Sequence, residues 1–317
     1  MSFTEEGLKQ HCETILKSRR IKNKIVILCE GERPPIDPNT ILSPQLYRKM
    51  EEMPDANFYR ACLPQWWTQY QPRFFNCGDR MDVLDTYSML LALHQQAPTN
   101  SYLSPEKLFA IVDLDIQIYN ISDYHFTDTE TVFYDLYQHG KVNSKTAKQH
   151  RIWVTGLVHK ESYFLIPELQ TTFDKCSTPP MYNSSLLLLD RVYRDMAKQM
   201  EIDPDLKNFF ETATRRIDYC SGLDCSGINC LQNSWEDCFD TAANETRKNE
   251  LIFALLTIEK AKEFWKQVKP PSGWTGSIRA FKDQLLLEIG RFYSDKGDNP
   301  RYHIAFFLKT LYDSIGV

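Results

Sequence analysis

Three acidic residues follow two apolar runs of the chain, each at the point where a run ends. Residues 25–29 (IVILC) lead directly into Glu30. Residues 108–112 (LFAIV) lead into Asp113 and, after one leucine, Asp115. Short runs rich in β-branched residues predict buried parallel strands, and open α/β sheets bind ligands at the carboxyl ends of such strands. Because Mg²⁺ and Mn²⁺ prefer oxygen ligands, Glu30, Asp113 and Asp115 are predicted to form a divalent-metal site.

The three carboxylates would divide the work of phosphoryl chemistry. Two acids at positions i and i+2 of a strand end can reach one ion if the chain begins to turn there, so Asp113 and Asp115 are the predicted metal ligands. Glu30 would share the metal, or act as a general acid or base if neighbouring charges raise its pKa. Gly31 would let the backbone approach a phosphate closely. For any single acid, the alternative is that it only starts a solvated loop.

Further strands and helices are needed to hold these residues in one sheet. Runs of apolar residues predict strands at 56–63, 74–77 and 152–158. Helices are expected over 43–53, from an N-cap at Asp79 onwards, and over 127–140, the last opened by a capping box of Thr127 and Glu130 and closed by Gly140. Strands that alternate with such helices are typical of a doubly wound α/β sheet.

The pattern changes after Lys175. Residues 176–180 (CSTPP) predict a linker, and the rest of the chain reads as mostly helical, with helices expected at 186–200, 204–218, 235–268, 278–293 and 303–315. We therefore expect an N-terminal helix with a basic lead-in at 1–23, an α/β domain at 24–175 with an insertion at about 33–75, and a helical domain at 176–317.

Four segments together resemble the Toprim family, and in particular OLD-type nucleases. Residues 28–31 (LCEG) and 112–115 (VDLD) resemble the E-G and D-x-D strand ends of that family. Residues 76–84 (NCGDRMDVL) are similar to its glycine-containing turn from strand to helix, and residues 160–165 (KESYFL) to its late acidic segment. The resemblance covers roughly residues 24–168, and the 83 positions between Glu30 and Asp113 imply an insertion in the sheet.

This resemblance implies a fold and an activity. The fold would be α/β, a Toprim-like (Rossmann-like) and mostly parallel sheet with helices on both faces, followed by an α-helical C-terminal domain. The activity would be that of a metal-dependent phosphodiesterase or nuclease acting on DNA or RNA, in a defence or mobile-element setting. Glu30 would be the acid/base residue, Asp113 and Asp115 would hold Mg²⁺ or Mn²⁺, and Glu161 would be a further ligand.

Candidate partners follow from the remaining charged residues. Lys160, Lys148 and Arg151, together with Gly31, are predicted to contact the nucleic acid. The sequence contains no G-x-x-x-x-G-K-[ST] loop, so an ATPase would have to be supplied by a protein partner in trans. A homo-oligomer is a further expectation. The competing hypothesis is a non-catalytic Toprim-like scaffold or binding subunit of a larger complex, in which the acids only start loops.

Composition narrows the class of protein. The net charge of -5 argues against a protein that coats nucleic acid through overall charge, although a local basic groove remains compatible with it. No apolar run is long enough to cross a bilayer, and the N-terminal residues lack the apolar centre of a secretory signal. The odd count of nine cysteines suits a reducing compartment. These features predict a cytoplasmic protein without membrane contact.

Three other groups of residues have both a functional and a structural interpretation. The cysteines at 220, 225, 230 and 238 could surround zinc or an iron-sulfur centre, but their wide spacing favours unpaired thiols. Trp66 and Trp67 could stack on bases, and packing of the insertion onto the sheet is the preferred interpretation. His159, at the end of the last predicted strand, could contact a phosphate or simply face solvent.

Overall fold

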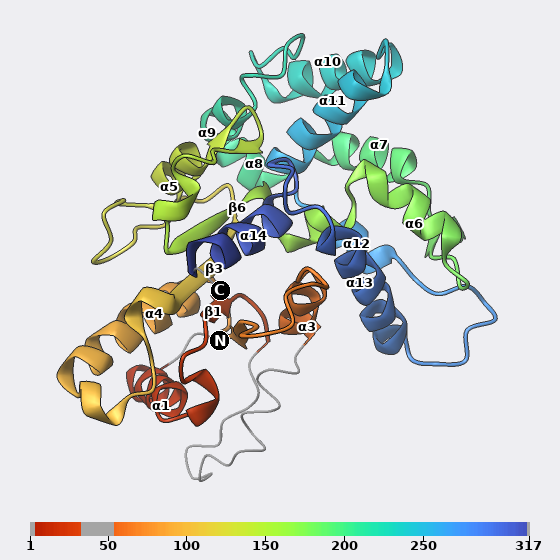
Figure 1. Ribbon diagram of the computed structural model, residues 1–317. Coiled ribbons are helices and arrows are strands. Elements are labelled where there is room, and N and C mark those ends of the chain that lie inside the picture. Colours follow the sequence, from red (N-terminus) through yellow and green to blue (C-terminus); the bar gives the residue numbers. More distant parts are fainter. Residues whose placement is uncertain (1–3, 33–53, 316–317) are drawn as a thin grey trace.

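A four-stranded parallel sheet forms the centre of the computed structural model, which describes residues 4–32 and 54–315. Its strands are β1 (Val26–Cys29), β2 (Arg73–Asn76), β3 (Leu108–Leu114) and β6 (Ile152–Val158), in the spatial order β2-β1-β3-β6 (Figure 1). All three pairings are parallel. The strands consist of apolar and β-branched residues buried on both faces, as expected of a parallel sheet covered by helices.

The strand order contains one reversal. From β1 the chain passes to β2 on one side and then returns to β3 on the other side of β1. The carboxyl ends of β1 and β3 therefore border a topological switch point, which is the usual ligand site of open α/β sheets. Both predicted acidic strand ends lie at this point.

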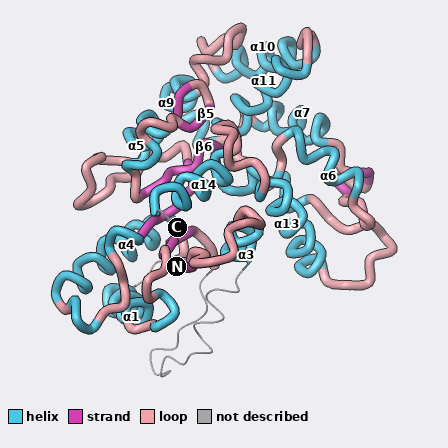
Figure 2. The backbone as a smooth tube through the Cα atoms, in the orientation of Figure 1, coloured by secondary structure: helices cyan, strands magenta, loops and turns pink. Residues whose placement is uncertain are grey.

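Helices of the first half of the chain pack on the sheet and on one another. Helix α1 (Glu5–Leu16) packs against α4 (Arg80–Gln96), and α4 packs against β1 and β3. Helix α5 (Thr129–Leu136) packs against β6. In Figure 2 the strands of the sheet lie in the middle of the molecule with helices around them. The α/β class predicted from the sequence is confirmed.

The second half of the chain is helical apart from one short hairpin, β7 (Met181–Tyr182) and β8 (Ser185–Leu186). Its helices are α6 (Gln170–Lys175), α7 (Leu189–Gln199), α8 (Pro204–Asn208), α9 (Phe210–Arg216), α10 (Ile228–Asp240), α11 (Glu245–Ile258), α12 (Lys262–Gln267), α13 (Ile278–Ser294) and α14 (His303–Ile315). None of the helices within the described ranges is long and apolar enough to cross a membrane.

The core is continuous across residue 175. Phe307 of α14 places its ring 4.4 Å from Trp153 of β6 and 6.4 Å from Phe109 of β3, measured between ring centroids. Helix α13 packs against α3 (Pro54–Ala61), and a Cβ built on Gly290 would lie 2.3 Å from the Cβ of Ala61. The helical half therefore covers the sheet directly, and glycine at 290 is what lets α13 approach α3 so closely.

The prediction of a strand at 56–63 is wrong, because this segment forms helix α3. Its buried residues are Ala56, Phe58, Tyr59, Cys62 and Leu63, which recur at the i, i+3 and i+4 spacing of a helix. Pro54 stands at the first helical position, where a missing N–H has no cost. The helix predicted over 43–53 lies outside the described residues.

Three predicted helices also differ from those in the structure. Helix α5 is capped by Asp128, which forms a capping box with Thr131, so Thr127 and Glu130 do not cap it. Gly140 turns a small hairpin, β4 (Tyr137–Gln138) and β5 (Lys141–Val142), after the helix has ended at Leu136. The long helices expected at 204–218 and 235–268 are broken into α8 and α9 and into α10, α11 and α12.

The tryptophan pair packs on the C-terminal helix. Trp67 is buried, and its ring centroid lies 5.3 Å from that of Tyr312 in α14. Trp66 lies 4.5 Å from the same tyrosine and is half exposed. The predicted structural role is therefore right in kind, although the partner that these rings contact is α14.

Candidate functional site

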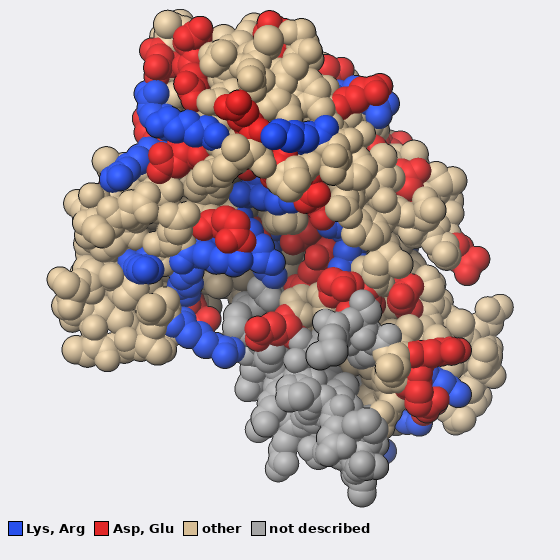
Figure 3. All heavy atoms as spheres, turned by 180° about the vertical axis from the view of Figure 1, so that it is seen from behind, with Lys and Arg blue, Asp and Glu red and all other residues tan. Residues whose placement is uncertain are grey.

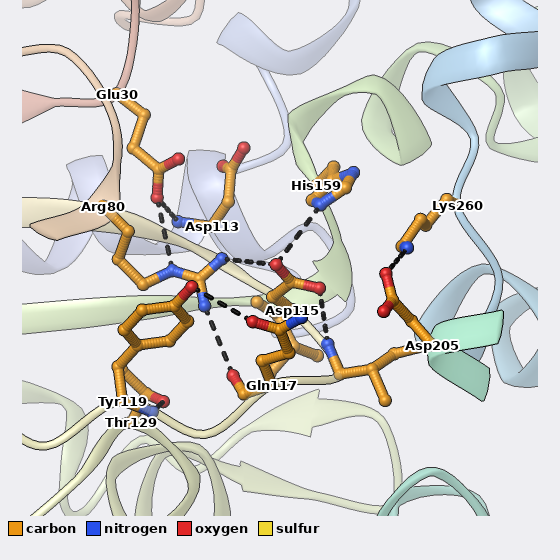
Figure 4. A network of polar contacts seen from close by, with 12 residues as sticks. Glu30, Arg80, Asp113, Asp115, Gln117, Tyr119, Thr129, His159, Asp205 and Lys260 are labelled. Carbon is orange, nitrogen blue, oxygen red and sulfur yellow. Dashed lines mark hydrogen bonds and ion pairs between the residues drawn. The ribbon is translucent and has the colours of Figure 1, made fainter. Parts of the chain in front are cut away.

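Glu30, Asp113 and Asp115 lie close together at the carboxyl end of the sheet (Figure 4). Glu30 follows β1 directly, and its Oε1 accepts a hydrogen bond from the backbone N–H of Asp113 at 2.7 Å. Asp113 stands near the end of β3, and Asp115 is the first residue after that strand. Residues that are 83 positions apart in the chain thus meet, as the sequence predicted.

An irregular pairing between β3 and β6 lets Asp113 turn toward Glu30. Val112 pairs with Val154, but Leu114 pairs with Val158, so the register shifts at Asp113. The Leu114 N–H donates to Oγ1 of Thr155 at 2.7 Å instead of to a backbone carbonyl. A bulge of this kind re-aims a side chain locally. Here the irregular pairing leaves the backbone N–H of Asp113 available to donate to the carboxylate of Glu30.

A pair of glycines brings a helix to the same edge of the sheet. Gly31 and Gly78 exchange two backbone hydrogen bonds of 2.9 and 3.0 Å. Gly78 has φ +105°, a conformation that other residues rarely adopt, so glycine is required there. Asp79 then caps α4, as predicted, through a reciprocal capping box with Asp82. The first turn of α4 therefore lies beside the three acids.

Arg80 is the cation between these acids, and the sequence had not singled it out. Its Nε lies 3.6 Å from Oε1 of Glu30, and its Nη2 lies 3.2 Å from Oδ2 of Asp115. The guanidinium also donates to the carbonyl of Gln117 and stacks over the Tyr119 ring at 4.6 Å. Only 7% of its side chain is exposed. The available signal was its position: the first residue of a helix that starts at a strand end.

The two residues that follow β6, His159 and Lys160, also contact the acids. The backbone N–H of Lys160 donates to Oδ2 of Asp113 at 3.1 Å. Nε2 of His159 lies 3.8 Å from Oδ2 of Asp115. Glu161 follows in a short 3₁₀ turn, and its negative charge acts on His159. Lys160 thus reaches the site through its backbone, and Glu161 is the next residue of the chain, whereas the role of His159 had been left open.

The proton affinities of these groups are shifted in different directions. Burial, followed by the charge of Asp113, raises the pKa of Glu30 to about 8, although Arg80 opposes the rise. Burial alone would raise the pKa of Asp115, but His159 and Arg80 together hold this pKa well below its ordinary range. Burial would lower the pKa of His159, but the surrounding carboxylates raise it. Two carboxyl groups with opposite shifts suit a pair of which one moves a proton.

The fit of a divalent cation depends on the free ligand atoms. Within residues 4–32 and 54–315, no three His, Cys, Asp or Glu side chains converge into a complete metal-binding group. Oδ1 of Asp113 is nevertheless buried and has no hydrogen-bond partner among the described residues. Mg²⁺ and related ions often use only one or two protein ligands and keep several waters. Oδ1 of Asp113 is therefore the candidate ligand atom for such a cation.

Arg216 of α9 fixes the loop after β3 from behind. Its Nη2 donates to the backbone carbonyl of Asp115 at 2.7 Å, and its Nε lies 3.0 Å from Oε1 of Glu130. The side chains of Arg216 and Glu130 are 1% and 8% exposed. Glu130, predicted to be part of a capping box, is instead the counterion of this arginine. The helical half of the chain thus contributes directly to the position of Asp115.

Arg151 and Lys148, which were predicted to contact the nucleic acid, do not lie beside the three acids. Arg151 precedes β6, with its guanidinium over the Phe109 ring at 4.7 Å, and Lys148 is exposed in the turn before it. His159 follows the other end of the same strand. At a rise of about 3.3 Å per residue, roughly 25 Å separates the two strand ends. Arg151 and Lys148 therefore lie at the opposite end of β6 from the three acids.

The remaining candidate features provide no stronger site. The thiols at 220, 225, 230 and 238 are free; Cys225 and Cys230 are exposed. On the face shown in Figure 3, acidic and basic side chains are interspersed around a central hollow. This face carries no broad surface of one sign. Any attraction of a polyanion to it must be local.

Comparison of the chain with protein-family models, curated proteins and solved structures found no match. The resemblance to Toprim proteins therefore depends on the four segments quoted above and stays a prediction.

Proposed function

We propose that this protein is a divalent-cation-dependent phosphodiester hydrolase that acts on DNA or RNA. One observation carries the proposal: Glu30 and Asp113 meet at the switch point of a parallel sheet, and Oδ1 of Asp113 is buried without a partner among the described residues. Such a position is where open α/β sheets bind ligands, and an unsatisfied buried carboxylate oxygen is costly unless a ligand completes it.

The residues of the site would act in distinct ways. Asp113 would hold the cation, which when bound neutralises charge on the phosphate and makes water more acidic. Glu30, whose pKa is raised to about 8, would carry the proton of the attacking water or of the leaving group. Arg80 would fix Glu30 and Asp115 through its ion pairs and add positive charge near the developing negative charge.

The test is an incubation of the purified protein with supercoiled plasmid, single-stranded DNA and RNA, each with Mg²⁺, Mn²⁺ or EDTA. Cleavage should require the cation, and Asp113→Asn should reduce it by about 10²-fold or more. Asp123→Asn is the matched control, because Asp123 is exposed and has φ +56°, a conformation that asparagine tolerates. Equal cleavage by wild type and Asp113→Asn would contradict the proposal.

A non-catalytic binding subunit is the second candidate, and Arg80 is the observation that favours it. This single buried guanidinium lies against both Glu30 and Asp115 and offsets part of their negative charge. A built-in cation of this kind takes over part of the role that a metal would otherwise have in holding the carboxylates together. Calorimetry with Mg²⁺ and Mn²⁺ distinguishes the candidates: heats that do not differ between wild type and Asp113→Asn would favour the binding subunit.

A further inference from the structure

Two exposed cysteines lie at the start of helix α10. Cys225 precedes the helix and Cys230 belongs to its first turn, with four residues between them. Both thiols are exposed, whereas Cys220 is buried and Cys238 is half-buried. Exposed thiols are open to oxidation, and redox-sensing cysteines often have a second cysteine close by. The position of Cys225 relative to Cys230 therefore decides whether the two can act as a pair.

Hydrogen bonds hold the neighbours of the two cysteines together. The N–H of Asp224 donates to Oγ of Ser234 at 2.8 Å, and this hydroxyl donates to the carbonyl of Leu231 at 3.1 Å. Asp224 is the residue before Cys225, and Leu231 is the residue after Cys230. A single hydroxyl group thus joins the residues next to both cysteines.

The segment before α10 runs back along the side of the helix. The carbonyl of Gly222 accepts a hydrogen bond from Sγ of Cys238 at 3.5 Å, and Asp224 contacts Ser234 one turn earlier in the helix. The segment is therefore antiparallel to α10, on the face that carries residues 230, 234 and 238. Cys225 thus lies beside the first turns of the helix.

The turn that joins the two cysteines is short and unobstructed. Gly227 is the N-cap of α10, and a Cβ built on it would meet no described atom within 4 Å. Oδ1 of Asp224 accepts a hydrogen bond from the N–H of Ser226 at 3.0 Å, which bends the chain at Cys225. A disulfide needs Cα atoms within about 7 Å of each other. A bent turn whose two ends are held on one face of a helix meets this requirement with little movement.

We propose that Cys225 and Cys230 form a reversible disulfide that responds to the redox state around the protein. Disulfides in reducing compartments are usually transient, and exposed ones are the easily reduced, regulatory kind. The bond would fasten residues 222–227 to the first turn of α10. These residues follow α9, whose Arg216 holds the carbonyl of Asp115, so the bond would restrain the chain that continues from this arginine.

Oxidised glutathione is the oxidant in the proposed reaction. The thiolate of one cysteine attacks a glutathione sulfur, breaks the S–S bond and releases one glutathione, which takes up the proton that the cysteine lost. The other cysteine then loses its proton, attacks the mixed disulfide and releases the second glutathione as a thiol. Two cysteines are thereby oxidised, and one glutathione disulfide is reduced. Burial and the charge of Asp224 raise the pKa of Cys225, so we expect Cys225 to react in the second step.

The test is incubation of the reduced full chain with oxidised glutathione, followed by blocking of the remaining thiols and peptide mapping by mass spectrometry. Wild type should show a bond between Cys225 and Cys230, and dithiothreitol should restore both thiols. Cys225→Ser should instead carry glutathione on Cys230. Cys176→Ser, which removes a half-buried thiol elsewhere, is the matched control and should form the bond as wild type does.

Every other result in wild type would overturn the inference. Glutathione held on both Cys225 and Cys230 would show that the two sulfurs do not reach each other. A bond from either of them to Cys220 or Cys238 would show a different pairing. Retention of both thiols would show that glutathione does not oxidise this turn. The hydrolase proposal would stand in each case, because it does not use these cysteines.

Discussion

Breaking the buried ion pair between Arg216 and Glu130 should destabilise the protein strongly. Replacing Arg216 with Leu leaves the Glu130 carboxylate, 8% exposed, without its counterion. Removing one partner of such a pair costs about 3–5 kcal/mol. The lost hydrogen bond to the Asp115 carbonyl adds about 1–2 kcal/mol. We therefore expect Arg216→Leu to lower the free energy of unfolding by about 4–7 kcal/mol.

A double-mutant cycle separates the pair from its surroundings. Glu130→Leu alone should cost about 3–5 kcal/mol, because it leaves the guanidinium buried and unpaired. Replacing both residues with Leu removes both charges, so the double variant should lose far less than the sum of the single variants. The expected coupling energy is at least about 2 kcal/mol, measured by urea unfolding followed by circular dichroism.

Two results would contradict the expected coupling between Arg216 and Glu130. If each single variant lost less than about 1 kcal/mol, the pair would be solvated in the folded protein. If the double variant lost the sum of the two single losses, Arg216 and Glu130 would act independently. Either result would remove the argument that α9 fixes the loop of Asp115.

Three further predictions concern stability. Burial lowers the pKa of His303 to about 4, so the stability that is present above pH 6.5 should fall by about 3 kcal/mol as the pH drops through 4. In His303→Gln the urea midpoint of unfolding should not show this dependence on pH. Burial and Asp203 raise the pKa of Glu259 to about 8, so stability is lost as the pH rises from 4.5 through 8. The melting temperature of Glu259→Gln should therefore exceed that of wild type at pH 9 and equal it at pH 4. Gly290→Ala should cost about 1–3 kcal/mol through its contact with Ala61, whereas Gly273→Ala, with open space around it, should melt like wild type.

The strands of the sheet were predictable because buried parallel strands are continuous apolar runs. Residues 152–158 were assigned without error, and the acids after residues 29 and 112 follow from the same runs. The shorter apolar segment at 56–63 was misassigned, because alternating and helical spacing coincide over a few residues and Pro54 was not read as a helix start. Length and flanking residues decide such segments.

The part of the site that lies directly at strand ends was predictable from the sequence. Glu30, Asp113 and Asp115 each follow a strand, and parallel strands share one carboxyl edge. Arg80 and His159 follow strands too, but the sequence did not single out Arg80 and left the role of His159 open. Arg216 is 101 positions from Asp115 and lies on a helix of the second half, so only tertiary packing reveals its role.

The register shift between β3 and β6 has a consequence for any attempt to engineer this sheet. Residues 155–157 of β6 stand opposite Asp113 alone, so the strands run out of step at this one position. Deleting the extra residues of β6 at this position would give regular backbone pairing between β3 and β6. The same change would draw the Asp113 amide back toward its neighbour strand and rotate the carboxylate away from Glu30. A redesign toward regularity would thus remove the hydrogen bond between Asp113 and Glu30 that the irregular pairing allows.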